Sequence, residues 1–161
     1  MFPRTPVDSI SMESFLIRLA VLAEKATLED LQLRASLTNA GDRDALLAHP
    51  DAIEIPAGQL TAARVFIAEK NGAIAGFAAI EPRSDGDADL DALFVDPNIR
   101  RFGVGRLLVE HCAAIARRNG SVALHVIGNP HAKEFYRASG FEQTGLTKTR
   151  FGVGLLFRKY L

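Results

Sequence analysis

Arg100-Arg101-Phe102-Gly103-Val104-Gly105 is the stretch that decides the fold of this chain, because of what lies on either side of it. The apolar residues 90–95 precede it and predict a strand, and an amphipathic run from 104 to about 118 follows and predicts a helix. A basic glycine loop in that position offers free backbone N–H groups, and the helix dipole adds partial positive charge. The stretch therefore predicts an anion cradle for a phosphorylated cofactor.

Outside this stretch, the sequence predicts an α/β domain with a mixed sheet of about seven strands and four or so helices. Asn71-Gly72 between two apolar segments is a strong signal for a type I′ hairpin. Because strands alternate with helices only in the second half of the chain, we expect a mixed rather than a wholly parallel sheet. The expected strands are 15–22, 64–69, 73–80, 90–95, 122–126, 141–147 and 151–158, and the expected helices are 27–36, 42–48, 104–118 and 130–139, with loop or weak helix between 49 and 61.

The bulk composition fits one domain with no nucleic-acid surface. With 161 residues, of which 48% are hydrophobic, the chain is long enough to bury its own core. Residues 1–13 contain two prolines and several polar residues, so we expect a tail there and a single domain over residues 14–161. The 19 basic residues balance the 19 acidic residues, which argues against nucleic acid or a membrane surface as a partner.

The cysteine content and the lack of long apolar runs indicate the cellular compartment in which the protein is expected. A single cysteine, Cys112, has no partner for an internal disulfide, which suits a reducing compartment. The N-terminus lacks the features of a signal peptide, and no apolar run approaches the ~20 residues that a membrane span requires. The four histidines show no ligand spacing, so we expect no metal. These patterns predict a cytoplasmic protein.

Two nucleotide-binding motifs are similar to the glycine loop, but each lacks a required residue. A Rossmann fingerprint needs a small third residue where Leu108 stands. A P-loop needs lysine and then serine or threonine, whereas Arg106 and Leu107 follow the second glycine. A second copy of the loop pattern, Arg150-Phe151-Gly152-Val153-Gly154, precedes no helix, so we assign no ligand to it.

Two separate segments together resemble the GNAT superfamily of N-acetyltransferases. Arg100-x-x-Gly103-x-Gly105, preceded by Leu93-Phe94-Val95-Asp96-Pro97, is similar to that family's acetyl-coenzyme A motif. Asn129, followed by Ala132, Phe135-Tyr136 and Gly140-Phe141, is similar to its second signature. The resemblance covers residues 74–141 well and the first seventy residues by element order. It implies a GNAT-type fold and transfer of an acetyl group from acetyl-coenzyme A to a primary amine, by direct attack and without an acyl-enzyme.

The resemblance also implies a role for each matching residue. Backbone N–H groups of residues 101–106 would hold the coenzyme A pyrophosphate, and the pantetheine arm would run along Leu93-Phe94-Val95. An N–H near Val95 or Phe94 would polarise the thioester carbonyl, Asn129 would contact the pantetheine or the adenine-side arm, and Tyr136 would give a proton to the departing thiolate. The implied cofactor-binding set is Leu93, Phe94, Val95, Arg100, Arg101, Phe102, Gly103, Val104, Gly105, Arg106, Asn129 and Tyr136.

The group that takes the proton of the amine is harder to assign from the sequence. Asp89 lies where some family members have a glutamate, on the strand that leads to the cofactor loop, and Asp91 points to the same face two residues later. Either carboxylate would act through water. We rank both above His125, which lies on the next strand, so the candidate catalytic residues are Tyr136, Asp91 and Asp89.

Several alternatives stay open at this point. Without the resemblance, Tyr136 beside Phe135 is more typical of core packing, and Asn129 is equally a helix N-cap. A non-catalytic acyl-coenzyme A sensor and an interaction module that pairs through its last two strands are the rival functions. The acceptor is open among small-molecule and peptide amines, and the resemblance implies a homodimer.

Overall fold

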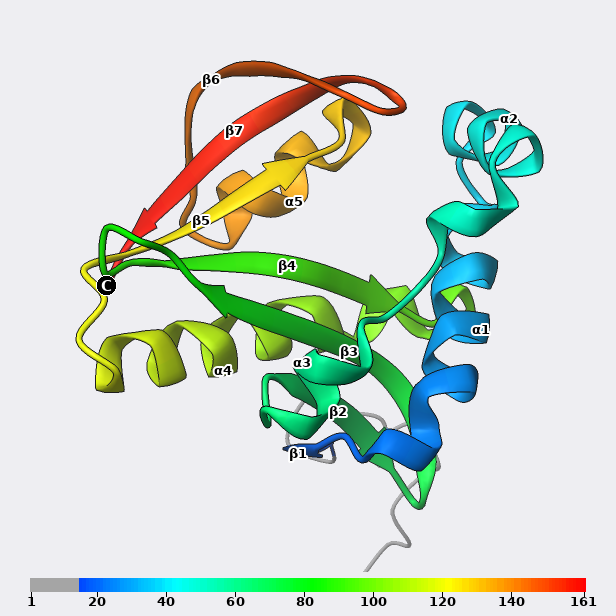
Figure 1. Cartoon of the computed structure of the whole chain (residues 1–161), viewed down its shortest axis with the longest axis horizontal. Coiled ribbons are helices and arrows are strands. Elements are labelled where there is room, and N and C mark those ends of the chain that lie inside the picture. Colours follow the sequence, from blue (N-terminus) through cyan, green and yellow to red (C-terminus); the bar gives the residue numbers. More distant parts are fainter. Residues whose placement is uncertain (1–14) are drawn as a thin grey trace, which may run out of the picture.

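A seven-stranded sheet forms the centre of the structure, a computed structural model that describes residues 15–161. Its strands lie in the order β1-β2-β3-β4-β5-β7-β6 (Figure 1). Among these strands β4 and β5 pair in parallel and all other neighbours are antiparallel, so the predicted mixed sheet is confirmed. The strands are β1 (Leu16–Leu19), β2 (Val65–Lys70), β3 (Ala73–Pro82), β4 (Ala88–Val95), β5 (Ala123–Gly128), β6 (Glu142–Thr149) and β7 (Gly152–Tyr160).

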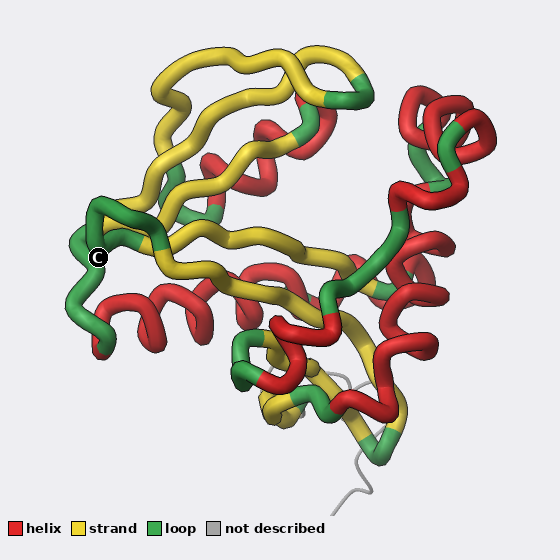
Figure 2. Tube along the Cα trace, in the orientation of Figure 1, coloured by secondary structure: helices red, strands yellow, loops and turns green. Residues whose placement is uncertain are grey.

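The described residues form five α-helices, and α1 and α2 lie at the end of the sheet toward which β4 and β5 diverge (Figure 2). They are α1 (Lys25–Ser36), α2 (Ala40–Ala48), α3 (Ala57–Thr61), α4 (Val104–Arg118) and α5 (Lys133–Ala138). The short 3-10 segments are η3 (Leu22–Glu24), η4 (Pro50–Ala52), η5 (Pro97–Phe102) and η6 (Pro130–Ala132). Within residues 15–161, no helix combines the length and apolar character of a membrane span.

Two apolar clusters cover the two faces of the sheet. On one face α4 buries Val104, Leu108 and Cys112 against the strands, each with no exposed surface. On the other face Leu28 of α1 and Leu60 of α3 pack against β2 and β3. Full burial of a side chain the size of leucine contributes about 1.5–3 kcal/mol. Strands β2 and β3 are therefore apolar on both faces, which is why their sequences are nearly unbroken hydrophobic runs.

The predicted hairpin between β2 and β3 is confirmed in its detail. Asn71 has φ +52° and Gly72 has φ +80°, so both turn residues lie in the left-handed region. A type I′ turn requires this conformation at both central positions, and asparagine and glycine adopt it at low cost. The tight turn sets β2 beside β3 from Lys70 and Ala73 onward.

Strands β4 and β5 are joined at one end only. Their parallel register contains two pairs, Ala88 with Leu124 and Asp89 with His125. Farther along, β4 continues to pair with β3 and β5 continues to pair with β7, so the two strands diverge, as Figure 1 shows. The diverging edges have no partner strand among the described residues, so the sheet is open from Leu90 to the end of β4 at Val95.

The first predicted strand and its helix differ from the structure in their bounds. The strand ends at Leu19 rather than at residue 22, because Glu24 turns the chain: its carboxylate binds Arg18 on β1 at 2.7 Å and accepts the N–H of Val21 at 3.0 Å. This contact makes residues 22–24 a 3-10 turn, and α1 begins at Lys25. The predicted tail, residues 1–13, lies outside the described residues.

Candidate acetyl-transfer site

The glycine loop and the first turn of α4 have the features of the predicted cradle. Gly103 has φ +75°, a conformation that favours glycine, and it turns the chain from η5 into α4. In the described structure no side chain caps α4, and the N–H of Leu107 donates to the carbonyl of Gly103 at 3.0 Å. The N–H groups of Val104, Gly105 and Arg106 precede this bond, at the helix positions that ordinarily have no partner within the helix. The positive end of the helix dipole lies at the same point, which makes the turn suitable for an anion.

Gly105 allows α4 to approach α5 and β4 closely. A Cβ atom added at Gly105 would lie 3.0 Å from Cε1 of Phe135 on α5 and 3.5 Å from Cγ2 of Val95 on β4. The first of these distances is shorter than ordinary van der Waals contact. The absence of a side chain therefore brings the first-turn N–H groups of α4 next to the open end of β4.

Arg100 and Asp96 attach the loop to the end of α1. Nη2 of Arg100 donates to the carbonyl of Ala35 at 3.0 Å and to Oγ1 of Thr38 at 2.8 Å. The carboxylate of Asp96 lies 3.3 Å from Nη1 of Arg34, also on α1. Arg100 thus has structural partners in Ala35 and Thr38 and also lines the cleft beside the loop.

The end of β4 directs two N–H groups away from β3. The N–H of Asp96 donates to the carbonyl of Ala75 on β3 at 2.8 Å. Because successive residues of a strand point their N–H groups to opposite edges, Val95 and Leu93 direct theirs toward the split. By the same alternation the N–H of Phe94 faces β3. Of the two residues considered for polarising a carbonyl, the geometry therefore favours Val95.

A cavity of about 480 Å³ fills the split between β4 and β5. Its walls come from these two strands, from the first turn of α4, from α5 and from the junction of α1 and α2. The site residues that line it are Leu93, Phe94, Val95, Arg100, Gly105, Asn129, Tyr136 and Asp91. Arg101 and Phe102 belong to η5, while Gly103, Val104 and Arg106 belong to the helix start. The structure thus brings residues from distant parts of the sequence to one cleft.

Tyr136 lies in an aromatic cluster and also lines the cleft. Its ring centroid is 5.2 Å from those of Phe135 and Phe157 and 5.5 Å from that of Phe141. No side-chain or backbone hydrogen bond from a described residue contributes to the pKa of its hydroxyl, which burial alone shifts. Burial raises the pKa of Tyr136 to about 12, so the hydroxyl stays protonated at neutral pH. The side chain therefore packs in the core and keeps a hydrogen-bond donor available to the cleft.

Asn129 contacts α2 instead of capping the turn that follows it. Its Nδ2 donates to Oδ2 of Asp42 at 3.3 Å, and its side chain makes no capping bond to η6. Nε2 of His131 lies 3.8 Å from the same carboxylate. Asn129 therefore occupies the N-cap position of η6, as expected, but its side chain makes no capping bond and lines the cleft between β5 and α2.

A second cavity, of about 510 Å³, adjoins the first and holds both candidate acids. Oδ1 of Asp89 pairs with Nη1 of Arg83 at 2.9 Å. Oδ2 of Asp91 accepts a hydrogen bond of 2.6 Å from Nε2 of Gln59. The two cavities share Leu90, Asp91, Val126 and Ile127. Asp91 therefore lies at their junction, whereas Asp89 lines the second cavity only.

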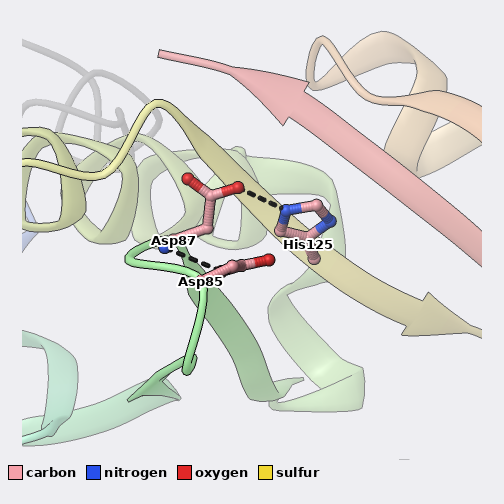
Figure 3. A group of neighbouring side chains, drawn as sticks. All are labelled: Asp85, Asp87 and His125. Atoms are coloured by element: carbon pink, nitrogen blue, oxygen red, sulfur yellow. Dashed lines mark hydrogen bonds and ion pairs between the residues drawn. The ribbon is translucent and has the colours of Figure 1, made fainter.

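His125 belongs to a network that holds the β3–β4 loop on β5 (Figure 3). Its Nε2 lies 2.9 Å from Oδ2 of Asp87, whose other oxygen accepts the N–H groups of Val122 at 3.1 Å and Ala123 at 3.2 Å. The N–H of Asp87 in turn donates to Oδ1 of Asp85 at 2.9 Å. The bond to His125 is the largest cause of a lowered pKa at Asp87. Because these groups already bind one another, His125 is a weaker candidate base than Asp91.

Gln59 is a site residue that the sequence analysis missed. It falls within the stretch expected to be loop or weak helix, and the structure places it in the five-residue helix α3. A glutamine has no characteristic spacing to a carboxylate thirty-two positions later in the chain. The sequence indicates the position of Gln59 only indirectly, because the apolar Leu60 and the strand that starts at Val65 predict that this segment lies against the sheet.

A family model described as acetyltransferase (GNAT) domain matches residues 61–143, which is more than half of the chain. The matched region contains the central strands, the glycine loop, α4 and α5. The chain therefore belongs to the GNAT family of acetyltransferases, and the resemblance read from the two motifs is confirmed.

Solved structures share the whole fold. A GCN5-related N-acetyltransferase from Rhodopseudomonas palustris superposes with a TM-score of 0.78, at 19% identity, over 91% of this chain and 95% of that one. The protein yncA from Salmonella typhimurium, solved with its cofactor acetyl-CoA, gives a TM-score of 0.67, at 19% identity, over 91% and 94%. At these identities the likeness concerns the fold, and the predicted fold class is confirmed.

Sequence similarity to characterised relatives is confined to part of the chain. Peptidyl-lysine N-acetyltransferase YjaB of Escherichia coli K12 is 43% identical over 56 residues. That alignment covers 35% of this chain and 37% of YjaB, so the chain spans well under half the length of this curated relative.

Proposed function

We propose that this chain is an acetyl-CoA-dependent N-acetyltransferase that passes an acetyl group directly to a primary amine within a ternary complex. The observation that carries the proposal is the split between β4 and β5, which opens at the uncapped first turn of α4. A helix terminus that favours phosphate, beside an unpaired strand edge, suits a ligand with a pyrophosphate and a long amide-bearing arm. Membership of the GNAT family and the acetyl-CoA held by yncA support the same cofactor.

Acetyl-CoA would supply an activated acyl group as its thioester. The N–H groups of Val104, Gly105 and Arg106 would bind its pyrophosphate, because they belong to a first turn that no side chain caps and lie at the positive end of the α4 dipole. The outward N–H groups of Leu93 and Val95 would hydrogen-bond the pantetheine arm along β4. Asn129 would border the arm from the β5 side of the cleft.

Val95 and Tyr136 would act on the reacting thioester. The N–H of Val95 would donate to the carbonyl oxygen, where negative charge develops as the amine attacks, and a fixed backbone donor of this kind is a large catalytic term. The Tyr136 hydroxyl would donate to the departing sulfur. Because burial raises the pKa of Tyr136 to about 12, its hydroxyl is protonated at neutral pH and can donate a hydrogen bond to that sulfur.

Asp91 would receive the amine. Its carboxylate is exposed and lies where the two cavities meet, so an ammonium group can reach it from the second cavity. The amine nitrogen must lose a proton to attack the thioester, and Asp91 would take that proton through water. Asp89 already pairs with Arg83, which leaves it the weaker of the two candidates.

The acceptor would be a primary amine on a small molecule or a peptide. The second cavity offers polar groups at Arg83, Asp89 and Thr144 beside apolar walls from Leu156 and Phe157. The peptidyl-lysine specificity in the name of YjaB supports a lysine side chain as one acceptor.

Calorimetric titration with acetyl-CoA tests the cofactor site. We expect micromolar binding by the wild-type chain and at least a hundredfold loss in Gly105→Glu, whose side chain would enter the cradle with a negative charge. Gly58→Glu is the matched control, because a Cβ at Gly58 meets no atom within 4 Å. It should bind as the wild type does. Equal affinity in all three proteins, or no binding by any, would overturn the cofactor assignment.

Thiol release with a panel of amines tests the transfer. The panel contains a lysine peptide with a blocked N-terminus, a free amino acid and an aliphatic diamine. We expect free coenzyme A to appear only with an amine present, together with one acetylated product. A chain that binds acetyl-CoA but acetylates none of these amines would act as a sensor instead, and the enzymatic proposal would fall.

A further inference from the structure

Gln59 has a buried polar side chain, and backbone hydrogen bonds fix the main chain that carries it. It is 6% exposed, and a buried amide without a hydrogen-bond partner is costly. Its N–H donates to the carbonyl of Pro56, and its carbonyl accepts the N–H of Arg64, each at 3.0 Å. The next residue, Leu60, is 5% exposed and anchors α3 in the apolar cluster beneath the sheet. The position of the Gln59 amide is therefore set by the core.

Asp91, the partner of Gln59, lies at an irregularity of β4. Ile80 pairs with Leu90, but its neighbour Ala79 pairs with Ala92, so Asp91 is the extra residue of a β-bulge. A bulge redirects a side chain and releases it from the regular ladder. A carboxylate in that position is free to occupy several rotamers unless a second contact selects one. The bond of 2.6 Å from Gln59 is that contact.

Asp91 has a neutral hydrogen-bond partner, whereas the acidic side chains near it are paired with basic side chains. Within the described residues, no cationic group lies within 4.0 Å of Asp91, and its hydrogen bond comes from a neutral amide. A neutral donor orients a carboxylate without cancelling its charge. The neighbouring pairs are Asp89 with Arg83, Glu81 with Arg64 and Asp87 with His125, each at 2.9 Å.

We propose that Gln59 is a positioning residue for the amine acceptor. It holds one oxygen of Asp91 at the junction of the two cavities and leaves the negative charge of that carboxylate for the ammonium group. This inference rests on the proposed function, because it concerns the amine side of the same site. The positioning role sets two requirements for residue 59: its side chain must donate a hydrogen bond to Asp91, and it must be uncharged. A role in stability alone would not require both.

Two substitutions at this position separate the two requirements. Gln59→Leu removes the donor at similar volume, and we expect kcat with the blocked lysine peptide to fall at least tenfold because Asp91 is no longer oriented. Gln59→Lys keeps a donor but adds a positive charge beside Asp91. We expect it to raise KM for the peptide at least tenfold, with a smaller change in kcat. Calorimetry should give the wild-type dissociation constant for acetyl-CoA in both variants.

Ser121→Ala is the matched control for lost stability. Ser121 is also buried, at 8% exposed, and its hydroxyl donates to the carbonyl of Gly86 at 3.0 Å, away from both cavities. It should lower the melting temperature about as much as Gln59→Leu and leave kcat and KM within twofold of wild type.

The outcomes separate this inference from the proposed function. If Gln59→Leu and Ser121→Ala reduce activity equally, or if Gln59→Lys leaves KM unchanged, the positioning role is overturned and the acetyltransferase proposal stands. If the wild-type chain acetylates no amine of the panel, the function fails and the role of Gln59 fails with it. Crystal structures of the wild type and Gln59→Leu give an independent check, since we expect the Asp91 carboxylate to leave its position only in the variant.

Discussion

Tyr136 is the residue whose surroundings say most about the chemistry of the cleft. It combines a ring packed against three phenylalanines with a hydroxyl whose pKa is shifted by burial alone, in a side chain that lines the cleft. We expect Tyr136→Phe to lower kcat by about 100-fold or more, the range of a positioned general acid. The melting temperature of the variant and its affinity for acetyl-CoA should stay near the wild-type values, because the substitution keeps the aromatic ring and removes no hydrogen bond within the described part of the protein. A variant with unchanged kcat would assign Tyr136 to core packing alone.

Tyr136 and Cys112 together predict how stability depends on alkaline pH. Burial raises the pKa of each to about 12, from ordinary values of 10.0 and 9.0. The unfolded chain therefore loses these protons first as the pH rises. Their contribution is fully present below pH 9 and is lost progressively toward pH 12, on the order of 3 kcal/mol for each group. Urea unfolding at pH 8 to 11 measures this slope, and Cys112→Ala should flatten its lower part. The same slope in that variant would contradict the assignment.

Gly128 holds space for the Tyr136 ring. A Cβ at Gly128 would lie 2.7 Å from Cε2 of Tyr136 and 3.2 Å from Cε2 of Phe157. We expect Gly128→Ala to destabilise the protein by about 1–3 kcal/mol, the usual cost of overpacking, and to lower kcat by moving the hydroxyl. Gly58→Ala has open space around the new methyl group and should be neutral or stabilising. Thermal melts of the two variants provide the comparison.

At the scale of elements, α4 carries both the cradle and the packing that positions it. Leu108 has no exposed surface and lies one turn after the N–H groups of the helix start. We expect Leu108→Ala to cost about 2–5 kcal/mol through lost burial and a cavity, and to weaken acetyl-CoA binding if the helix start shifts. Leu47→Ala, at a leucine that is 70% exposed, should change stability by less than about 0.5 kcal/mol. Denaturant titrations of both variants test the difference.

The elements that the sequence predicted well are those with a strong local signal. Asn71-Gly72 identified its hairpin because few residues tolerate φ values of +52° and +80° in succession. The helix over 104–118 was predicted with its observed bounds, because Gly103 and Asn119-Gly120 flank an amphipathic run. The glycine loop was likewise found from local context, and the residues around the cleft came from the family resemblance.

The features that the sequence did not predict depend on contacts between distant segments. The short β1 ends where Glu24 reaches back to Arg18, and nothing in the local pattern requires that bond. The side chain of Asn129 prefers Asp42, eighty-seven positions away, to its own helix turn. Gln59 meets Asp91 at a bulge of β4, thirty-two positions away, and no local pattern predicts that bulge. Each case needs the tertiary structure to be known.

At the scale of the whole molecule, one exposed ion pair connects the first part of the chain with the last hairpin. Nη2 of Arg150, between β6 and β7, lies 3.2 Å from both carboxylate oxygens of Asp51 in η4. The hydrogen bond from Arg150 is the largest cause of a lowered pKa at Asp51. We expect Arg150→Ala to raise the pKa of Asp51 back toward its ordinary value with no measurable change in melting temperature, because exposed pairs contribute little. Carbon NMR of the carboxyl groups checks this, and an unchanged pKa would show that the two segments do not meet in solution.

The split between β4 and β5 divides the sheet into two parts, strands β1 to β4 and strands β5, β7 and β6, which are joined by a short seam of backbone pairing. The seam consists of the pairs Ala88 with Leu124 and Asp89 with His125. A ligand arm that bonds to the edge of β4 would take the place of an absent strand and lengthen the seam. Bound coenzyme would then be a temporary part of the sheet as well as a reactant. Release of the product would open the seam again in every catalytic cycle.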